Sequence, residues 1–215
     1  MNKKTGKLIL FLFLILLIIF LFVSYSFLFL NTIDNKIEIG IIDSSISSLN
    51  RNKVFEINRK DKNEDESHGN EMVNFALNFS PNAKIYYYDA SIDGKINDNS
   101  IKKGLSWMKE KGIRVVNISL SSTRFSNELE SYINEFVEGG GIIYASYNNK
   151  KSTFDYPAQY TNVVGVGTKS VVKSKHIDSI YRTSRIFLNG KIYLGNSYLS
   201  LTEAILKAKE IRNEK

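Results

Sequence analysis

Residues 83–146 read AKIYYYDASIDGKINDNSIKKGLSWMKEKGIRVVNISLSSTRFSNELESYINEFVEGGGIIYAS. In this stretch, three apolar runs of strand length alternate with two segments whose apolar residues recur at helical spacing, such as Ile101, Leu105 and Met108. The predicted strands are 83–88, 113–118 and 141–145, and the predicted helices are 100–111 and 127–138. Strands that alternate with helices in this way predict βαβ units, and therefore a mostly parallel sheet covered by helices.

The same alternation continues on both sides of this stretch. On the amino-terminal side, we expect strands at 36–42 and 54–57 and a helix at 69–77. On the carboxyl-terminal side, we expect strands at 162–166, 185–188 and 191–194 and a helix at 197–212. Residues 31–215 are numerous enough to form one sizeable core, so the sequence predicts a single α/β domain there.

Residues 8–30 form an apolar run of 23 residues without a charge. A helix of that length crosses a hydrocarbon core of about 30 Å. Lys3, Lys4 and Lys7 precede the run, which predicts that residues 1–7 are cytoplasmic and that residues 31–215 lie outside the cell membrane. A cleaved signal peptide is the alternative, but its apolar region is usually about 7–15 residues long and ends in small residues. We therefore expect a single-pass signal anchor, with the lipid bilayer as the partner of residues 8–30.

The charge and cysteine content exclude several classes of function. The net charge is +7, and without the three amino-terminal lysines 26 basic residues face 22 acidic ones. This small excess does not indicate a nucleic-acid partner, and a nearby anionic membrane surface accounts for it. The chain has no cysteine, which excludes disulfides and thiol catalysis. No cofactor is predicted.

Polar residues that directly follow predicted strands are candidate site residues, because ligands of open α/β sheets bind beyond the carboxyl ends of the strands. They are Asp43, Ser119–Ser122 and Ser146–Asn149. His68 lies at a loop-to-helix junction and Ser197 at the start of the last helix, and with Asp43 they supply what hydroxyl nucleophilic catalysis requires. Each alone has an ordinary explanation: a turn aspartate, a surface histidine and an N-cap serine. His176, among lysines, is expected on the surface.

Several segments together resemble motifs of the subtilisin-like serine proteases, the subtilases of peptidase family S8. They are IGIIDSS around Asp43, SHGNEMVNFAL around His68, VVNISLSS (115–122), IIYASYNN (142–149), FDYPAQYTNVVGVGT (154–168) and GNSYLS around Ser197. Each motif is weak alone, but the order Asp, His, Ser along the chain is the order of this family. The resemblance covers about residues 36–205 and implies a subtilisin-like three-layer α/β fold.

The resemblance implies that Asp43, His68 and Ser197 form the catalytic triad of a serine endopeptidase. Ser197 would attack the scissile carbonyl, His68 would accept and return the proton, and Asp43 would orient His68. Asn149 would donate its side-chain amide to the oxyanion, an interaction typically worth about 2.7–4 kcal/mol. The register leaves Asn148 as the alternative donor. The expected substrate is an exported peptide or protein.

The resemblance also implies where a substrate binds. An extended peptide would add a strand along Ser119, Leu120 and Ser121, and Ser146 is included in this substrate site. Asp155 occupies a position that in the family lies at the far end of the P1 pocket. If its carboxylate points inward it favours Lys or Arg at P1, and the alternative is a solvated loop aspartate.

The chain departs from the family pattern at several positions. Ser45, Ser121 and Asn148 stand where the family usually has glycine, and Leu201 replaces a proline. Residues 77–80 leave no room for a calcium-binding insertion, so no metal site is expected, and no propeptide is expected between the anchor and the first strand. These departures leave a catalytically inactive, peptide-binding subtilase as the main alternative. An esterase or acyltransferase that uses the same triad is the third possibility.

Overall fold

The computed structural model describes residues 13–17, 36–47, 50, 53–57, 67–91, 96–149, 154–168, 180–181 and 185–214. The chain divides into two units, residues 1–35 and residues 36–215. In the first unit, the described residues 13–17 are helical. The rest of the predicted anchor lies outside the described residues, and none of the helices that are described is long and apolar enough to cross a membrane.

The second unit contains a parallel sheet built from the apolar runs. Its strands, within the described residues, are β1 (Glu38–Asp43), β2 (Phe55–Ile57), β3 (Lys84–Asp89), β4 (Val115–Ile118), β5 (Ile142–Ser146), β6 (Val164–Gly167) and β7 (Ile180–Tyr181). They lie in the order β2-β3-β1-β4-β5-β6-β7, and all neighbours are parallel. A separate antiparallel hairpin consists of β8 (Arg185–Leu188) and β9 (Lys191–Leu194). The predicted α/β fold with a mostly parallel sheet is confirmed.

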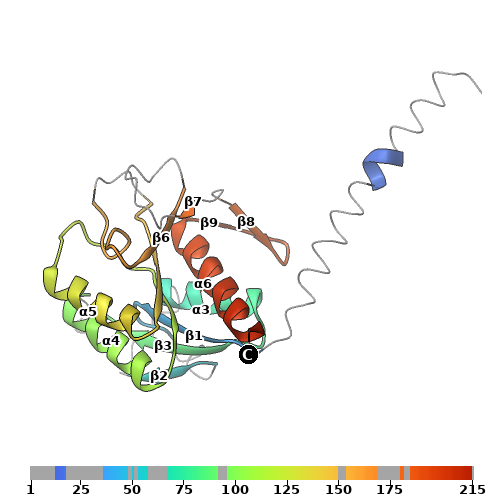
Figure 1. Ribbon diagram of the computed structural model, residues 1–215. Helices are drawn as coiled ribbons and strands as arrows, with labels where there is room; N and C mark the ends of the chain where they lie inside the picture. Colours follow the sequence, from blue (N-terminus) through green and yellow to red (C-terminus); the bar gives the residue numbers. More distant parts are fainter. Residues whose placement is uncertain are drawn as a thin grey trace, which may run out of the picture. The chain divides into compact units, whose positions relative to one another are not determined.

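Helices cover both faces of the sheet, which makes three layers (Figure 1). In this unit the described helices are α3 (His68–Phe79), α4 (Asp98–Glu110), α5 (Asn127–Glu138) and α6 (Asn196–Asn213). One core cluster contains Leu105 of α4 and Ile133 of α5, and the other contains Met72 of α3 and Ile205 of α6. Because both faces are covered, the central strand β1 is buried along nearly its whole length.

Polar side-chain caps decide where α3, α4 and α5 begin. α4 starts two residues before the predicted Ser100, because the Asn97 side chain accepts from the Ser100 backbone and the Ser100 side chain accepts from Asn97 in return. In the same way, Ser67 accepts from the backbone of Asn70, which starts α3 at His68. The predicted helices are therefore confirmed, with ends that shift by less than one turn.

The strands differ from the prediction mainly in number and ends. The two-residue strand β7 was not expected, because two residues carry no periodic pattern. The run predicted as 113–118 pairs only from Val115 onward. The bounds of β8, β9 and α5 match the predicted ranges. His176 lies outside the described residues.

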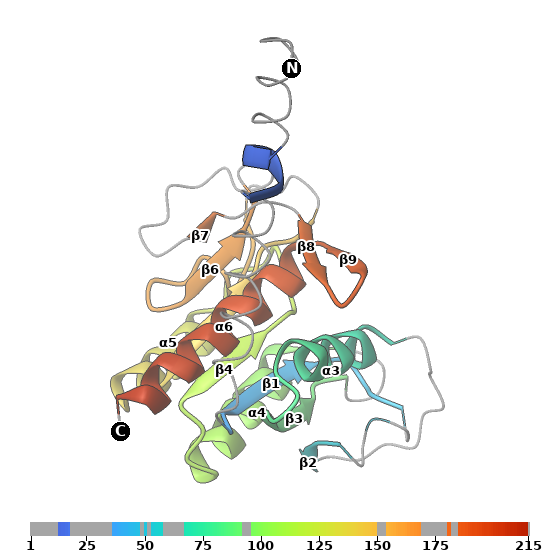
Figure 2. The same cartoon turned by 90° about the vertical axis from the view of Figure 1, so that its right-hand side faces the viewer.

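The last helix, α6, runs from the carboxyl ends of the sheet strands toward their amino ends. It begins directly after the β8–β9 hairpin (Figure 2). Near its other end, Arg212 Nη1 donates to the carbonyl oxygen of Lys36 at 2.7 Å, just before β1 begins. The amino terminus of α6 therefore lies toward the carboxyl edge of the sheet, where Asp43 ends β1.

Candidate active site

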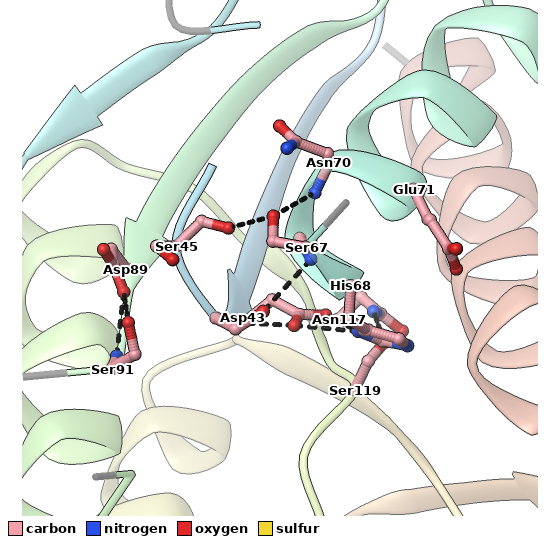
Figure 3. Close-up of polar contacts among 12 residues, drawn as sticks. Asp43, Ser45, Ser67, His68, Asn70, Glu71, Asp89, Ser91, Asn117 and Ser119 are labelled. Atoms are coloured by element: carbon pink, nitrogen blue, oxygen red, sulfur yellow. Dashed lines mark hydrogen bonds and ion pairs between the residues drawn. The ribbon is translucent and has the colours of Figure 1, made fainter. Parts of the chain in front are cut away.

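His68 meets Asp43 at the carboxyl end of β1 (Figure 3). Asp43 is fully buried, and His68 is the first residue of α3. His68 Nδ1 lies 2.9 Å from each carboxylate oxygen of Asp43. Because a carboxylate only accepts, Nδ1 carries the hydrogen, and Nε2 is then the basic nitrogen of the neutral ring. His68 is thus in the tautomer that a general base acting through Nε2 requires.

The loop after β1 is bound to the start of α3, which holds this pair in place. The backbone N–H of Gly69 donates to Ser44 Oγ at 3.1 Å, and Ser67 Oγ donates to the carbonyl oxygen of Ser45. A side chain at position 69 would not fit, because its Cβ would lie 2.5 Å from the Ser44 carbonyl oxygen and would also collide with the Tyr87 hydroxyl. The Ser-His-Gly segment therefore has a steric reason for its glycine.

The charges around His68 favour its protonated form. Burial lowers the pKa of His68, but the hydrogen bond to Asp43 and the negative charges of Asp43 and Glu71 more than offset this effect. The pKa of His68 consequently lies above its usual value. Glu71 is one turn along α3 from His68 and was not recognised from the sequence, where only its i, i+3 spacing relates the two residues.

Ser197 lies in the first turn of α6. The N-cap of α6 is Gly195, whose φ of 124° suits glycine, and the helix begins at Asn196. The interpretation of Ser197 as an N-cap residue is therefore wrong. Ser197 is 9% exposed, and within the described residues no hydrogen bond joins it to His68. Such bonds often tighten only when substrate binds.

The segment before Ser197 is bound to the residues that directly follow β5. The backbone N–H of Asn196 donates to Asn149 Oδ1 at 2.9 Å, and Asn196 Nδ2 donates to the carbonyl oxygens of Tyr147 and Asn148 at 3.0 and 3.2 Å. The two ends of the Asn149 carboxamide are thereby distinguished, because Oδ1 must be the atom that accepts. Between the two predicted alternatives, it is the Asn149 side chain that contacts the segment containing Ser197.

A buried asparagine links α6 to the predicted substrate edge. Asn117 in β4 is fully buried. Its Oδ1 accepts from Ser200 Oγ at 2.7 Å, and its Nδ2 donates to Ser119 Oγ at 2.7 Å. One side chain therefore fixes the position of α6 relative to Ser119.

A cavity of about 430 Å³ opens beside the Asp43–His68 pair. Three predicted substrate-binding residues, Ser119, Leu120 and Ser121, line it together with this pair. Ser122, another of the polar residues expected after β4, lines it as well. The lining also includes residues that the sequence did not single out: Ser44, Ile96, Asn97, Asp98, Ile101, Arg124, Leu129, Tyr156 and Tyr160. The structure thus brings the strand edge after β4 and the Asp43–His68 pair to one concave surface.

Two predicted substrate-binding residues, Ser146 and Asp155, do not line this cavity. Both are buried, and Asp155 is only 2% exposed. Its Oδ2 accepts from the backbone N–H of Asn148 at 3.3 Å. The alternative of a solvated loop aspartate is therefore wrong. Nearby, Ser122 and Tyr156 exchange two backbone hydrogen bonds of 2.8 Å.

Comparison with solved structures defines the class of the fold. The chain is similar to the self-cleaved protease domain of PatA, with a TM-score of 0.62 and 14% identity over 83% of this chain and 82% of that one. It is also similar to a cold adapted subtilisin-like serine proteinase, with a TM-score of 0.61 and 14% identity over 82% of this chain and 75% of that one. The fold is subtilisin-like.

The sequence then identifies the family. The Subtilase family matches residues 31–192, and the chain belongs to this family. Subtilisin BL of Lederbergia lenta is 36% identical over 93 residues, which cover 42% of this chain and 35% of that relative. The match thus spans about a third of the relative's length. Ser197 lies beyond the residues matched to the family, so its assignment depends on the GNSYLS segment and on its place in α6.

Proposed function

We propose that this chain is a membrane-anchored serine endopeptidase that hydrolyses peptide bonds of exported peptides or proteins. The observation that carries the proposal is the bond between His68 Nδ1 and the buried carboxylate of Asp43, at the rim of a cavity large enough for several side chains. A buried carboxylate that fixes an imidazole tautomer beside an open cavity is what a serine nucleophile requires of its base.

The proposed chemistry is the one that the resemblance to the family implies for Asp43, His68 and Ser197. Ser197 Oγ attacks the scissile carbonyl carbon, and its proton passes to His68 Nε2. The imidazolium that forms is stabilised by Asp43, which remains ionised. His68 then delivers the proton to the leaving amine as the peptide C–N bond breaks, which leaves an acyl group on Ser197. A water molecule, deprotonated by His68, attacks this acyl-enzyme, and the product acid and free Ser197 are released.

The negative oxygen of the tetrahedral intermediate is stabilised from two sides. The side-chain amide of Asn149 donates from the segment after β5, and the backbone N–H of Ser197 donates from the start of α6. The positive end of the α6 dipole adds to this effect. Removal of one such donor typically costs about 10²–10³ in rate.

The substrate lies extended in the cavity along Ser119, Leu120 and Ser121. We assign Asp155 to the far end of the P1 pocket, because it is buried beside the backbone of Asn148. A carboxylate there selects Lys or Arg at P1.

The anchor in residues 8–30 places the domain outside the cell membrane, and its support is the uncharged run preceded by three lysines. The test is fractionation of cells that produce the full chain with a carboxyl-terminal tag. The tagged chain is expected in the membrane fraction, and added protease is expected to remove the tag from intact cells. A tag that resists protease in intact cells but not in lysed cells would refute the orientation.

The catalytic proposal is tested by labelling of the full-length chain in membranes with a fluorophosphonate probe. Ser197→Ala and His68→Ala are expected to abolish labelling, whereas Ser131→Ala, on the exposed face of α5, is expected to leave it unchanged. Absence of labelling in a folded wild-type chain would favour the inactive, peptide-binding subtilase. If labelling occurs, cleavage of peptide rather than ester substrates distinguishes the peptidase from an esterase or acyltransferase.

A further inference from the structure

Tyr198 and Glu71 connect the two helices that carry Ser197 and His68. Tyr198 directly follows Ser197 in α6, and Glu71 is three residues after His68 in α3. The Tyr198 hydroxyl donates to Glu71 Oε2 at 2.9 Å. In Figure 3, Glu71 projects from α3 on the side of α6.

The ring of Tyr198 is held by aromatic contacts as well. Its centroid lies 5.1 Å from the ring of Phe75 and 5.2 Å from that of Tyr193, and both contacts are edge-on. Phe75 is fully buried in α3, one turn after Glu71. Tyr198 therefore packs along two successive turns of α3, and its hydroxyl position is determined by the packing of its ring.

The acceptor of this bond also acts on His68. The negative charge of Glu71 raises the pKa of His68. This effect is smaller than the opposite effect of burial and smaller than either of the two effects of Asp43. Glu71 shares a surface groove with two cations, Lys53 and Lys191, and with Tyr193 and Tyr198. Its carboxylate thus has two roles that can be separated, as a hydrogen-bond acceptor and as a charge.

We propose that Tyr198 and Glu71 are a positioning pair, which sets the distance between Ser197 and His68 by joining the first turn of α6 to the first turn of α3. The proposal rests on the proposed function of Ser197 and His68. Hydrogen bonds already fix His68 to β1 and the segment before Ser197 to the residues after β5, and the Tyr198–Glu71 bond is a direct polar link between their helices. Small errors in such a distance are costly, because a misplacement of about 1 Å can lower a rate by about 10².

Three variants separate the bond from the charge. Tyr198→Phe keeps the ring and removes the bond, and we expect the rate constant of fluorophosphonate labelling to fall about tenfold with no downward shift of its pH midpoint. Glu71→Gln keeps an acceptor for the hydroxyl and removes the charge, so we expect a maximal rate within about twofold of wild type and a midpoint at lower pH. Tyr193→Phe is the matched control, because it keeps a ring in the same aromatic contacts, and we expect no change.

Amide hydrogen exchange of the full-length chain gives a readout that does not depend on catalysis. Tyr198→Phe is expected to speed exchange in the first turns of α3 and α6 together, and Glu71→Gln is not. If the wild-type chain is not labelled, the proposed function fails, while the exchange measurement still tests the pair. Two results would overturn the proposal that Tyr198 and Glu71 are a positioning pair. One is unchanged labelling and exchange in Tyr198→Phe, and the other is a loss of labelling rate in Glu71→Gln as large as that in Tyr198→Phe.

Discussion

The backbone N–H of Asn196 donates to Asn149 Oδ1 at 2.9 Å, so the residue before Ser197 orients the carboxamide assigned to the oxyanion. The carboxamide uses its oxygen for this bond, which leaves its nitrogen as the end that can donate to a substrate. Two neighbouring asparagines that the sequence could not distinguish therefore have different surroundings, since Asn148 contributes its backbone to the bonds with Asn196 and Asp155.

The first prediction concerns these two asparagines. Asn149→Ala is expected to lower the rate constant for peptide hydrolysis by about 10²–10³, because it removes an oxyanion donor. Asn148→Ala keeps the backbone bonds and is expected to change the rate less than about threefold. The measurement is kcat on a peptide amide substrate, and a larger loss in Asn148→Ala than in Asn149→Ala would reverse the assignment.

The second prediction is the pH dependence of labelling at Ser197. Only neutral His68 can accept the Ser197 proton, so the labelling rate should rise with pH through the pKa of His68. Because the pKa of His68 is raised by Asp43 and Glu71 against the opposite effect of burial, the half-maximal rate is expected above pH 6.5. Asp43→Asn is expected to lower the rate by about 10⁴, since the negative charge is lost and the asparagine amide can donate to Nδ1, which favours the wrong tautomer of His68. A midpoint below pH 6.5 in the wild-type chain would contradict this description of the pair.

The third prediction concerns the buried carboxylate of Asp155. A peptide library is expected to show cleavage after Lys or Arg that is at least about tenfold faster than after Leu or Phe, which corresponds to about 1.4 kcal/mol. Asp155→Asn keeps an acceptor for the Asn148 N–H and removes the charge, so the preference should disappear while cleavage after Leu persists. Asp98→Asn, in the neighbouring cavity, is the control and should retain the preference. A wild-type enzyme without preference for basic P1 residues refutes the role of Asp155.

The fourth prediction concerns Gly69. Gly69→Ala forces a methyl group against the Ser44 carbonyl and the Tyr87 hydroxyl, so it is expected to lower the free energy of unfolding by about 1–3 kcal/mol and to abolish labelling. Gly112→Ala is the control, because that position has a positive φ but no atom within 4 Å. It is expected to cost about 1–2 kcal/mol and to retain labelling. Retained labelling in Gly69→Ala would show that the loop after Asp43 does not set the position of His68.

The fifth prediction concerns Lys209 in α6. Burial lowers the pKa of Lys209 to about 8, and its Nζ is buried without a hydrogen-bond partner among the residues that the structure describes. In the unfolded chain the pKa of Lys209 returns to about 10.5. Between about pH 8 and pH 10.5 the unfolded state therefore binds more protons than the folded state, and the free energy of unfolding rises with pH in this range. Lys209→Met is therefore expected to raise the free energy of unfolding by about 1–3 kcal/mol at pH 7, and the gain should shrink toward pH 10.5.

Urea unfolding of the full-length chain at pH 7 and pH 10 measures this effect. Lys207→Met is the control, because Lys207 pairs with Glu210 near the surface and its loss should change stability by less than about 0.5 kcal/mol. A gain for Lys209→Met that is equal at both pH values would indicate better packing rather than removal of a buried charge.

Regular elements with a strong apolar pattern could be predicted closely. The bounds of α5, β8 and β9 agree with the sequence, because apolar spacing and turn residues act locally. The start of α4 was missed by two residues, because it depends on the exchange of bonds between Asn97 and Ser100. β7 could not be predicted, since a two-residue strand exists only through its pairing with β6.

By itself, the sequence determined the α/β class, the family and the residues able to carry the chemistry, because periodicity and motif order are properties of the chain. Only the tertiary structure decided which of these residues meet. It brings His68 against Asp43, gives Asn149 rather than Asn148 the side-chain contact with the segment before Ser197, and buries Asp155. Tyr198 and Glu71, 127 residues apart, are joined in the same way. The physical reason is that contacts between distant residues depend on strand order and helix packing, which local spacing does not encode.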